Sequence, residues 1–273
     1  MKHYLPDRLA RTQVKILLVG AGGTGSRILE NLVLLHKALL AKGHPQGLHV
    51  TVVDDDTVST ANVGRQAFYA CDVGSYKALT LVNRANMALG NVQWRGYVGR
   101  LTTKSKGIGE FDLVIGAVDN RSARLAILRS LERCGGGTRY WLDTGNGAAH
   151  GQVLLGEVTH GGRKTDDAWR LPHAGEMFPE AINSKLDSQE DDLPSCSLAE
   201  ALEKQELFVN PTVATAACNI LWLLFTRGEI SSHGAFINLE HMTTRPIEVD
   251  QEVWARFGVK RTGRREKVKS TSS

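Results

Sequence analysis

The sequence predicts an α/β fold in which a doubly wound, mostly parallel sheet carries helices on both faces, with extra closing strands after a long crossover loop. Short uninterrupted apolar runs, such as Val14–Val19, are typical of parallel strands that are buried on both faces. Amphipathic helical patterns alternate with these runs, as they do in βαβ units. The first run stops at a glycine-rich loop that opens a helix, which fits the same strand–helix succession.

The elements follow one another in the expected order along residues 14–158. We expect strands at residues 14–19, 48–53, 92–98, 112–117, 140–144 and 152–158, and helices at 24–41, 72–89 and 120–133. Each expected strand is short and apolar, and most of them end in Gly, Asp or another turn-forming residue. Together they form the predicted core of the sheet.

The chain changes character after residue 158. Residues 160–194 are polar with little periodicity, and we interpret residues 159–209 as a crossover loop. A connection of this length is often functional. Asn210 and Pro211 then predict a helix start, with Asn as the cap and Pro in the first turn. That helix runs to about Arg227, and strands at 235–239 and 246–249 close the fold. Residues 1–259 are therefore expected to form a single domain, with 210–259 as its closing part.

Composition excludes several classes of protein. The chain has 273 residues, of which 42% are hydrophobic and 23% charged, as in globular proteins. Its net charge of +4 arises because residues 260–273 carry +5 and the rest of the chain −1. We expect that basic tail to be disordered. A nucleic-acid partner is therefore not expected for the rest of the chain. The most apolar stretch, residues 211–225, is shorter than the ~20 residues of a spanning helix. It predicts a buried helix and no membrane association.

Four scattered cysteines form no CxxC pair. This pattern excludes a disulfide framework and predicts no zinc site. Together with an N-terminus that has no apolar signal segment, it favours a cytoplasmic protein.

The glycine loop is the first candidate binding element. Gly20, Gly22, Gly23 and Gly25 match G-x-G-x-x-G between a strand and a helix, a context in which backbone N–H groups bind a nucleotide phosphate. The alternative is a tight turn with no ligand. Asp54 ends the next strand and is the candidate for the ribose hydroxyls, although it follows Gly25 by 29 residues where the dinucleotide pattern has about 20.

Three charged residues separate phosphate chemistry from hydride transfer. Arg65 and Lys77 follow the second strand, and Asp119 follows the fourth, so the strand ends bring them to one crevice. Two cations and an acid beside a phosphate loop suit a triphosphate with magnesium. A nicotinamide-dependent oxidoreductase needs no such set. Each residue alone is otherwise a solvated surface charge.

These motifs carry a family resemblance. GAGGTGS, VVDDDTVSTANVGRQ, DVGSYKA and GAVDNRSAR follow in the order seen in the ThiF/MoeB/HesA superfamily, the adenylation fold shared with ubiquitin-activating enzymes. The chain resembles that superfamily closely over residues 14–158 and more weakly through the final helix and strands. The layout is most similar to the ThiF-like components of PRTRC bacterial operons.

The resemblance implies a Rossmann-like fold and ATP-dependent adenylation of the C-terminal carboxylate of a small, Gly-ending ubiquitin-like protein. It implies that Asp54 binds ribose, that Asn62, Arg65, Gln66 and Lys77 contact the nucleotide, and that Asp119 binds Mg²⁺. It also implies a homodimer in which an arginine near the N-terminus, Arg8 or Arg11, acts across the interface. A conjugating-enzyme-like protein is a further expected partner.

Cys196 is the candidate thioester nucleophile. It precedes an expected helical stretch at residues 198–207, and a cysteine at a helix N-terminus has a lowered pKa. The alternative is a loop cysteine with no role, because Ser197 stands where many activating enzymes have Thr. We interpret Cys71, Cys134 and Cys218 as packing residues.

Three other functions remain open at this point. One is a sulfur-carrier adenylyltransferase that forms no thioester. Another is an NAD(P)-dependent oxidoreductase, which the glycine loop alone supports. The third is a non-catalytic nucleotide-binding partner of an active subunit. The retained Arg65, Lys77, Asp119 and Cys196 favour an active enzyme.

Overall fold

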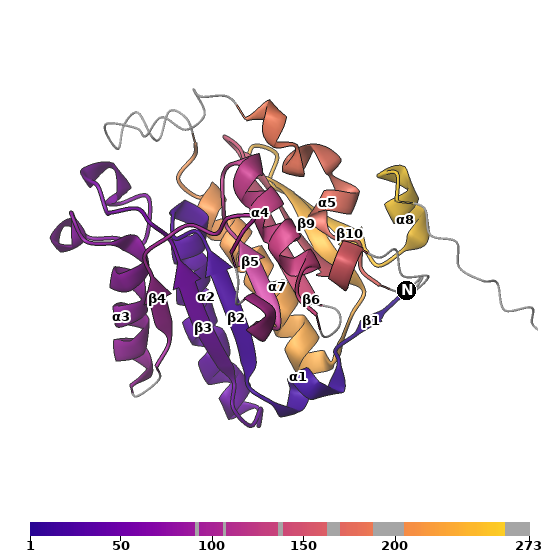
Figure 1. The fold of residues 1–273 in the computed structure, drawn as a ribbon, viewed down its shortest axis with the longest axis horizontal. Helices are drawn as coiled ribbons and strands as arrows, with labels where there is room; N and C mark the ends of the chain where they lie inside the picture. Colours follow the sequence, from indigo (N-terminus) through magenta and orange to yellow (C-terminus); the bar gives the residue numbers. More distant parts are fainter. Residues whose placement is uncertain (91–92, 106–107, 136–138, 163–169, 188–204, 260–273) are drawn as a thin grey trace, which may run out of the picture.

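A computed structural model of the chain describes all residues except 91–92, 106–107, 136–138, 163–169, 188–204 and 260–273 (Figure 1). Three predictions therefore fall outside the described residues: Cys196, residues 198–204 of the helix expected over 198–207, and the expected disordered tail. Within the described part, residues 205–208 form a bend and turn and not a helix.

The central sheet has eight described strands in the order β10-β9-β7-β6-β5-β2-β3-β4. The five parallel strands are β2 Val14–Val19, β3 Leu48–Val53, β4 Arg95–Tyr97, β5 Leu113–Gly116 and β6 Arg139–Asn146. The antiparallel strands are β7 His150–Val158, β9 Ser232–Asn238 and β10 Thr243–Glu248. The closing strands thus extend the same sheet, as expected. A separate pair joins β1 His3–Tyr4 to β8 Glu229–Ile230.

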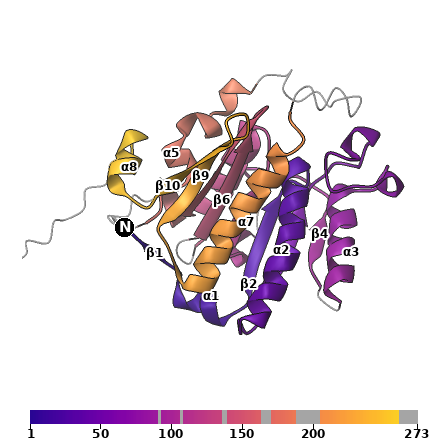
Figure 2. The ribbon, with the colours of Figure 1, turned by 180° about the vertical axis from the view of Figure 1, so that it is seen from behind.

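Helices cover both faces of this sheet, which confirms the predicted doubly wound α/β fold. Helices α2 Gly23–Ala41 and α7 Val209–Arg227 lie side by side on one face (Figure 2). Helix α4 Arg121–Glu132 and the short α5 Ala174–Met177 cover the other face (Figure 1). Helix α3 Lys77–Leu89 packs on α2 and β4, and the short helices α1 Asp7–Arg11 and α8 Gln251–Arg256 lie near the ends of the described chain.

Two expected elements start elsewhere. The helix expected over 72–89 begins only at Lys77, because Gly74 has a φ of +88° and breaks the helical path. Before it, Ala70–Asp72 forms a 3₁₀ turn in which the buried Asp72 carboxylate accepts hydrogen bonds from Tyr69 N and Arg84. Of the strand expected over 92–98, Arg95–Tyr97 form β4.

The prediction that Asn210 caps the closing helix is wrong. Helix α7 begins at Val209, two residues before the start that a cap at Asn210 implies, so Asn210 lies inside the helix and is buried. Its amide binds Thr24 and Asn146 on neighbouring elements, and these partners compete successfully with the local cap. Pro211 does lie in the first turn.

Helix α7 is long and apolar enough, by length and composition, to cross a membrane, and half of its most apolar window is buried inside the fold. It packs against α2, β6 and β7. This burial confirms the expectation of a buried helix over residues 211–225.

A polar contact lies inside the core where the closing segment meets the sheet. His233 on β9 and Trp254 on α8 are both fully buried. Trp254 Nε1 donates to His233 Nε2 at 2.9 Å, so the proton of the neutral ring is on Nδ1, which lies 2.7 Å from the carbonyl oxygen of Leu155. Burial lowers the pKa of His233 to about 4.

This buried imidazole predicts an acid-sensitive stability. Between pH 6.5 and 4 the unfolded chain carries a proton on His233 and the folded chain does not, so the free energy of unfolding falls as pH is lowered across that window. The full contribution is about 3 kcal/mol. We expect His233→Gln to lack this pH-dependent change in the free energy of unfolding. Urea unfolding of the wild type and the variant at several pH values measures it.

The wild-type profile alone does not isolate the effect of His233, because titration of Asp143 changes the free energy of unfolding in the opposite sense. Burial raises the pKa of that carboxyl to about 6, so its titration stabilises the folded chain as pH falls. The exposed His241→Gln serves as the control and should follow the wild-type profile. Parallel profiles for wild type and His233→Gln would contradict the assignment.

Candidate functional site

The candidate site lies at the C-terminal ends of β2, β3 and β5, where the strand order reverses and open α/β sheets form their binding crevice. Gly20 follows β2 and Ala117 follows β5, and the backbones approach so closely that a Cβ on Gly20 would lie 2.4 Å from Ala117 O. Gly20 has a φ of +93°, which other residues rarely adopt. The loop therefore needs glycine at this position.

The other loop glycines divide into packed and open positions. A Cβ on Gly25 would lie 2.0 Å from Gly20 O, and one on Gly23 would lie 2.5 Å from Asn210 Nδ2. A Cβ on Gly22 would meet nothing within 4 Å. Gly22 is also the N-cap of α2 and provides no side-chain cap for the first N–H groups. The backbone at Gly22 thus faces open space beside a helix N-terminus.

Asp54 turns toward this loop, as the sequence predicts. Its carboxylate accepts hydrogen bonds from Ala21 N at 2.6 Å and from Asp56 N at 2.9 Å. Burial raises the pKa of the Asp54 carboxyl, and these hydrogen bonds and the nearby Lys77 oppose that rise. The side chain is fixed against the glycine loop at the end of β3.

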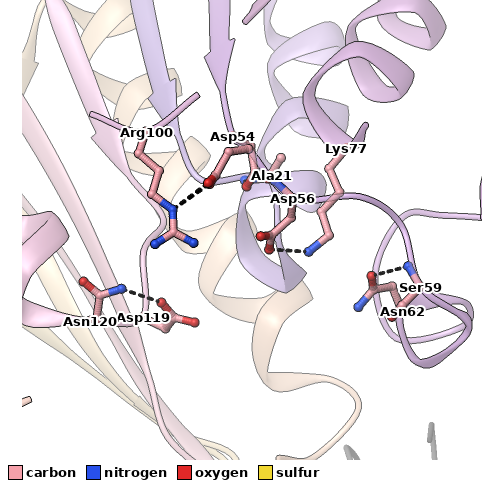
Figure 3. A network of polar contacts seen from close by, with 10 residues as sticks. Ala21, Asp54, Asp56, Ser59, Asn62, Lys77, Arg100, Asp119 and Asn120 are labelled. Carbon is pink, nitrogen blue, oxygen red and sulfur yellow. Dashed lines mark hydrogen bonds and ion pairs between the residues drawn. The ribbon is translucent and has the colours of Figure 1, made fainter. Parts of the chain in front are cut away.

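Two cations pair with the other acids of the same run (Figure 3). Lys77, whose side chain is buried at the start of α3, places Nζ 2.9 Å from Asp56 Oδ2. Arg100 binds both carboxylate oxygens of Asp55 through Nε, at 2.9 and 2.7 Å. No sequence motif points to Arg100. The backbone hydrogen bond from Gly99 N to Asp54 O places it there.

Asn62, Arg65 and Gln66 form one anchored segment after β3. The buried Asn62 accepts a hydrogen bond from Ser59 N at 2.9 Å and closes a 3₁₀ turn (Figure 3). Ala67 N donates to Ser26 Oγ on α2 at 3.1 Å, which fixes the segment to the glycine-loop helix. Arg65 is half-buried, and burial lowers the pKa of its guanidinium. Arg65 Nε and Gln66 Oε1 are buried and have no hydrogen-bond partner among the described residues.

Asp119 is exposed three residues beyond β5 and faces the same strand ends (Figure 3). Asn120 Nδ2 lies 3.3 Å from its carboxylate, and Asn120 Oδ1 accepts a hydrogen bond from Ala123 N and caps α4. Carboxylate oxygens of Asp54, Asp55 and Asp56 also lie within 4.8 Å of one another. Oxygen ligands of this kind suit a hard cation such as Mg²⁺.

The N-terminal arginines lie elsewhere in the single chain. Arg8 on α1 forms an ion pair with Asp112 at the start of β5, the opposite end of the strand from the glycine loop. Arg11 is exposed at the end of the same helix. A role for either residue across a dimer stays a prediction.

The described cysteines differ in their surroundings. Cys218 is buried in α7, and burial raises the pKa of its thiol to about 12, as expected for a packing residue. Cys134 is half-buried after α4, and burial raises the pKa of its thiol. The interpretation of Cys71 as a packing residue is wrong, because the 3₁₀ turn at Ala70–Asp72 leaves it exposed.

Fold and site together define a doubly wound α/β protein with a glycine loop, an acidic run and cations at the strand ends. The chain belongs to the ThiF family, whose model matches residues 6–252.

Relatives of known name include activating enzymes and adenylyltransferases. The chain is 31% identical over 147 residues to the SUMO-activating enzyme subunit uba-2 of Caenorhabditis elegans, which is 52% of this chain and 23% of that protein. It is 35% identical over 124 residues to the sulfur carrier protein adenylyltransferase of Thermus thermophilus, 44% and 41% of the two chains. It is 28% identical over 193 residues to the NEDD8-activating enzyme E1 catalytic subunit of Saccharomyces cerevisiae, 68% and 56% of the two chains. The chain thus matches 23%, 41% and 56% of the lengths of these relatives.

Solved structures share the fold. A crystal structure of PaaA aligns with a TM-score of 0.58 at 15% identity, over 89% of this chain and 75% of that one. The structure of MccB from E. coli with succinimide aligns with a TM-score of 0.56 at 14% identity, over 89% and 65% of the two chains. At these identities the likeness shows the fold alone.

The glycine geometry predicts opposite outcomes for two alanine substitutions. Gly25→Ala forces its Cβ against Gly20 O, and we expect it to lower the free energy of unfolding by at least about 3 kcal/mol. Gly22→Ala places its Cβ in open space and should change that free energy by less than about 1 kcal/mol. Urea unfolding of the two variants measures the difference, and equal effects would contradict the described loop.

Proposed function

We propose that this chain adenylates the C-terminal carboxylate of a small ubiquitin-like protein with ATP and releases pyrophosphate. The observation that carries the proposal is the arrangement at the ends of β2, β3 and β5, where an open glycine loop lies beside Asp54 and the Lys77–Asp56 pair, with Asp119 facing them (Figure 3). Arg65 is joined to the first turn of α2 through Gln205 and Asn210. Membership of the ThiF family and the names of its relatives support it. A doubly wound sheet with a glycine loop alone would serve many other ligands equally well.

The residues present fit a nucleoside triphosphate. The open backbone at Gly22 and the first N–H groups of α2 suit a phosphate, and Asp54 lies at the end of β3 where a carboxylate binds ribose. The unpartnered Arg65 Nε and Gln66 Oε1 are buried polar atoms whose desolvation is offset when a ligand binds them. The exposed Asp119 carboxylate suits Mg²⁺, which would neutralise phosphate charge.

In the proposed reaction a carboxylate oxygen of the small protein forms a bond to the α-phosphorus. The bond from that phosphorus to the pyrophosphate oxygen breaks, and pyrophosphate leaves with the electron pair. The carboxylate is a weak nucleophile and the phosphates are negative, so catalysis is mostly positioning and charge stabilisation. Arg65 and Lys77 stabilise the leaving pyrophosphate. Asp119 holds Mg²⁺.

Lys77 needs to exchange partners in this scheme. Its ammonium pairs with Asp56 at 2.9 Å, and its buried side chain limits it to a small region at the start of α3. A bound triphosphate offers a stronger negative charge at that place. Asp56 then serves to keep the buried ammonium charged and oriented before the nucleotide binds.

The proposed partners follow from the same family. The substrate is a small ubiquitin-like or sulfur-carrier-like protein with a Gly-ending C-terminus, encoded beside this chain in a PRTRC-type operon. The proposed assembly is a homodimer in which Arg8 or Arg11 of one chain supplements the clamp of the other. A conjugating-enzyme-like protein would receive the product if a thioester forms on Cys196.

The strongest alternative within this chemistry is adenylation without a thioester step, as the similarity to a sulfur carrier protein adenylyltransferase favours. A nicotinamide-dependent oxidoreductase is disfavoured, because it leaves Arg65, Lys77 and Asp119 without a purpose. Binding of ATP and of NADH, measured side by side, separates the two classes.

Exchange of radioactive pyrophosphate into ATP, dependent on the cognate small protein, tests the proposal. We expect Lys77→Ala and Asp119→Ala each to lower the exchange rate at least about a hundredfold, because each removes a charge that the transition state needs. Lys37→Ala, an exposed lysine on α2, is the matched control and should keep the wild-type rate. Wild-type exchange in either site variant would show that the site is wrongly assigned.

Cys196 is tested separately from adenylation. We expect Cys196→Ala to keep pyrophosphate exchange and to lose a covalent adduct with the small protein that reducing agents cleave. Intact mass spectrometry with ATP and the small protein measures the adduct, with Cys71→Ala as the control. An adduct that persists in Cys196→Ala excludes this nucleophile, and a wild-type chain without any adduct favours the adenylate as the final product.

A further inference from the structure

We infer that Gln205 is a positioning residue for Arg65, and that it couples the end of the crossover loop, at residues 205–209, to the nucleotide site. The inference deepens the proposed function and rests on it, since it takes Arg65 to bind the phosphates of ATP. Gln205 is the first described residue after 188–204, and the sequence analysis did not single it out.

The Gln205 amide uses both of its ends. Its Oε1 accepts hydrogen bonds from Arg65 Nη1 at 3.4 Å and from Asn210 Nδ2 at 2.7 Å, and its Nε2 donates to Gly147 O at 3.1 Å. The guanidinium can only donate and the carbonyl can only accept, so the chemistry of the partners fixes the orientation of the amide. The next residue adds a backbone hydrogen bond from Glu206 N to Ala148 O at 2.9 Å.

The same contacts continue to the glycine-loop helix. Asn210, which is 2% exposed, accepts at Oδ1 from Thr24 Oγ1 at 2.8 Å and from Asn146 Nδ2. Asn146 Nδ2 also donates to Thr24 Oγ1 at 2.8 Å. Gly23 leaves the space that the Asn210 amide occupies. A continuous polar chain therefore joins Arg65 to the first turn of α2 through Gln205 and Asn210.

The chemical type of residue 205 explains its role. A neutral amide oxygen orients the half-buried Arg65 and leaves its positive charge available, whereas the carboxylate of Asp56 neutralises Lys77. Within the described part of the chain Arg65 Nε has no partner, and Gln205 is the side chain there that hydrogen-bonds the guanidinium. Loss of this contact leaves a half-buried cation with more conformational freedom, which weakens phosphate binding.

A double-mutant cycle tests the inference, with isothermal titration of ATP and of AMP in the presence of Mg²⁺. We expect Gln205→Ala to weaken ATP binding about fivefold, the size of one ordinary net hydrogen bond. AMP binding should change less than about twofold, because AMP lacks the phosphates assigned to Arg65. In the Arg65→Ala background, Gln205→Ala should have no further effect on ATP, because coupled residues are non-additive.

Gln205→Glu gives a second measurement and keeps the size of the side chain. Its carboxylate would pair with Arg65 and compete with the phosphates, so we expect ATP binding to weaken more than in Gln205→Ala, and only when Arg65 is present. Gln46→Ala is the matched control. Among the described contacts, Gln46 Oε1 accepts a hydrogen bond from Gln13 N at 3.2 Å. Gln46 precedes β3, at the end of the strands opposite to the glycine loop. The control variant should leave ATP binding unchanged.

The outcomes separate the two hypotheses. Wild-type chain that does not bind ATP, or Arg65→Ala that binds ATP as wild type does, overturns the proposed site and this inference with it. If Arg65→Ala weakens ATP binding and the Gln205 variants do not, or if their effects add to that of Arg65→Ala, only the positioning role fails. Equal losses for ATP and AMP would show a merely structural role. Gln205→Glu carries the test if Gln205→Ala does not fold.

Discussion

The close approach between the glycine loop and the end of β5 is the constraint on which the site depends. Gly25 lies against Gly20 O, and Gly20 lies against Ala117 O, so neither position has room for a Cβ. This contact brings the ends of β2 and β5 together at the point where the strand order reverses. It places Asp119, two residues beyond Ala117, on the same side as the N-terminus of α2.

The cations of the site differ in whether their partner is charged or neutral. Two cations, Lys77 and Arg100, are held by carboxylates of the acidic run that follows β3, whereas Arg65 is held by a neutral amide. An ion pair of a buried ammonium needs its counter-ion because an unpaired charge is costly in the protein interior. The cation that retains its full charge is therefore the one beside the crossover segment. This difference makes Arg65 the group most sensitive to what surrounds it.

Most of the fold could be predicted from the sequence because local signals and tertiary packing agree there. Continuous apolar strands, Gly20 after β2 and Asn120 as the cap of α4 all lie where their residue types favour them. The start of α3 and the cap of α7 could not be predicted, because the conformation at Gly74 and the hydrogen bonds of the Asn210 amide depend on contacts with residues distant in the sequence. Arg100 and Gln205 were missed because polar residues in irregular segments have no periodicity that points to a partner. Asn146 was missed because it is the last residue of β6, beyond the strand expected at residues 140–144.

Asn210 shows why the closing helix belongs to the site and does not merely complete the core. As a cap it would satisfy one N–H of α7 and leave the rest of the molecule unaffected. As a buried amide it instead binds Thr24 in the first turn of α2 and Gln205 beside Arg65. Each of its hydrogen bonds is buried or half-buried, so removing one partner leaves an unsatisfied group on the others. Movement of α7 relative to α2 would break these hydrogen bonds, and the glycine-loop helix and Arg65 would then lose the support that they share.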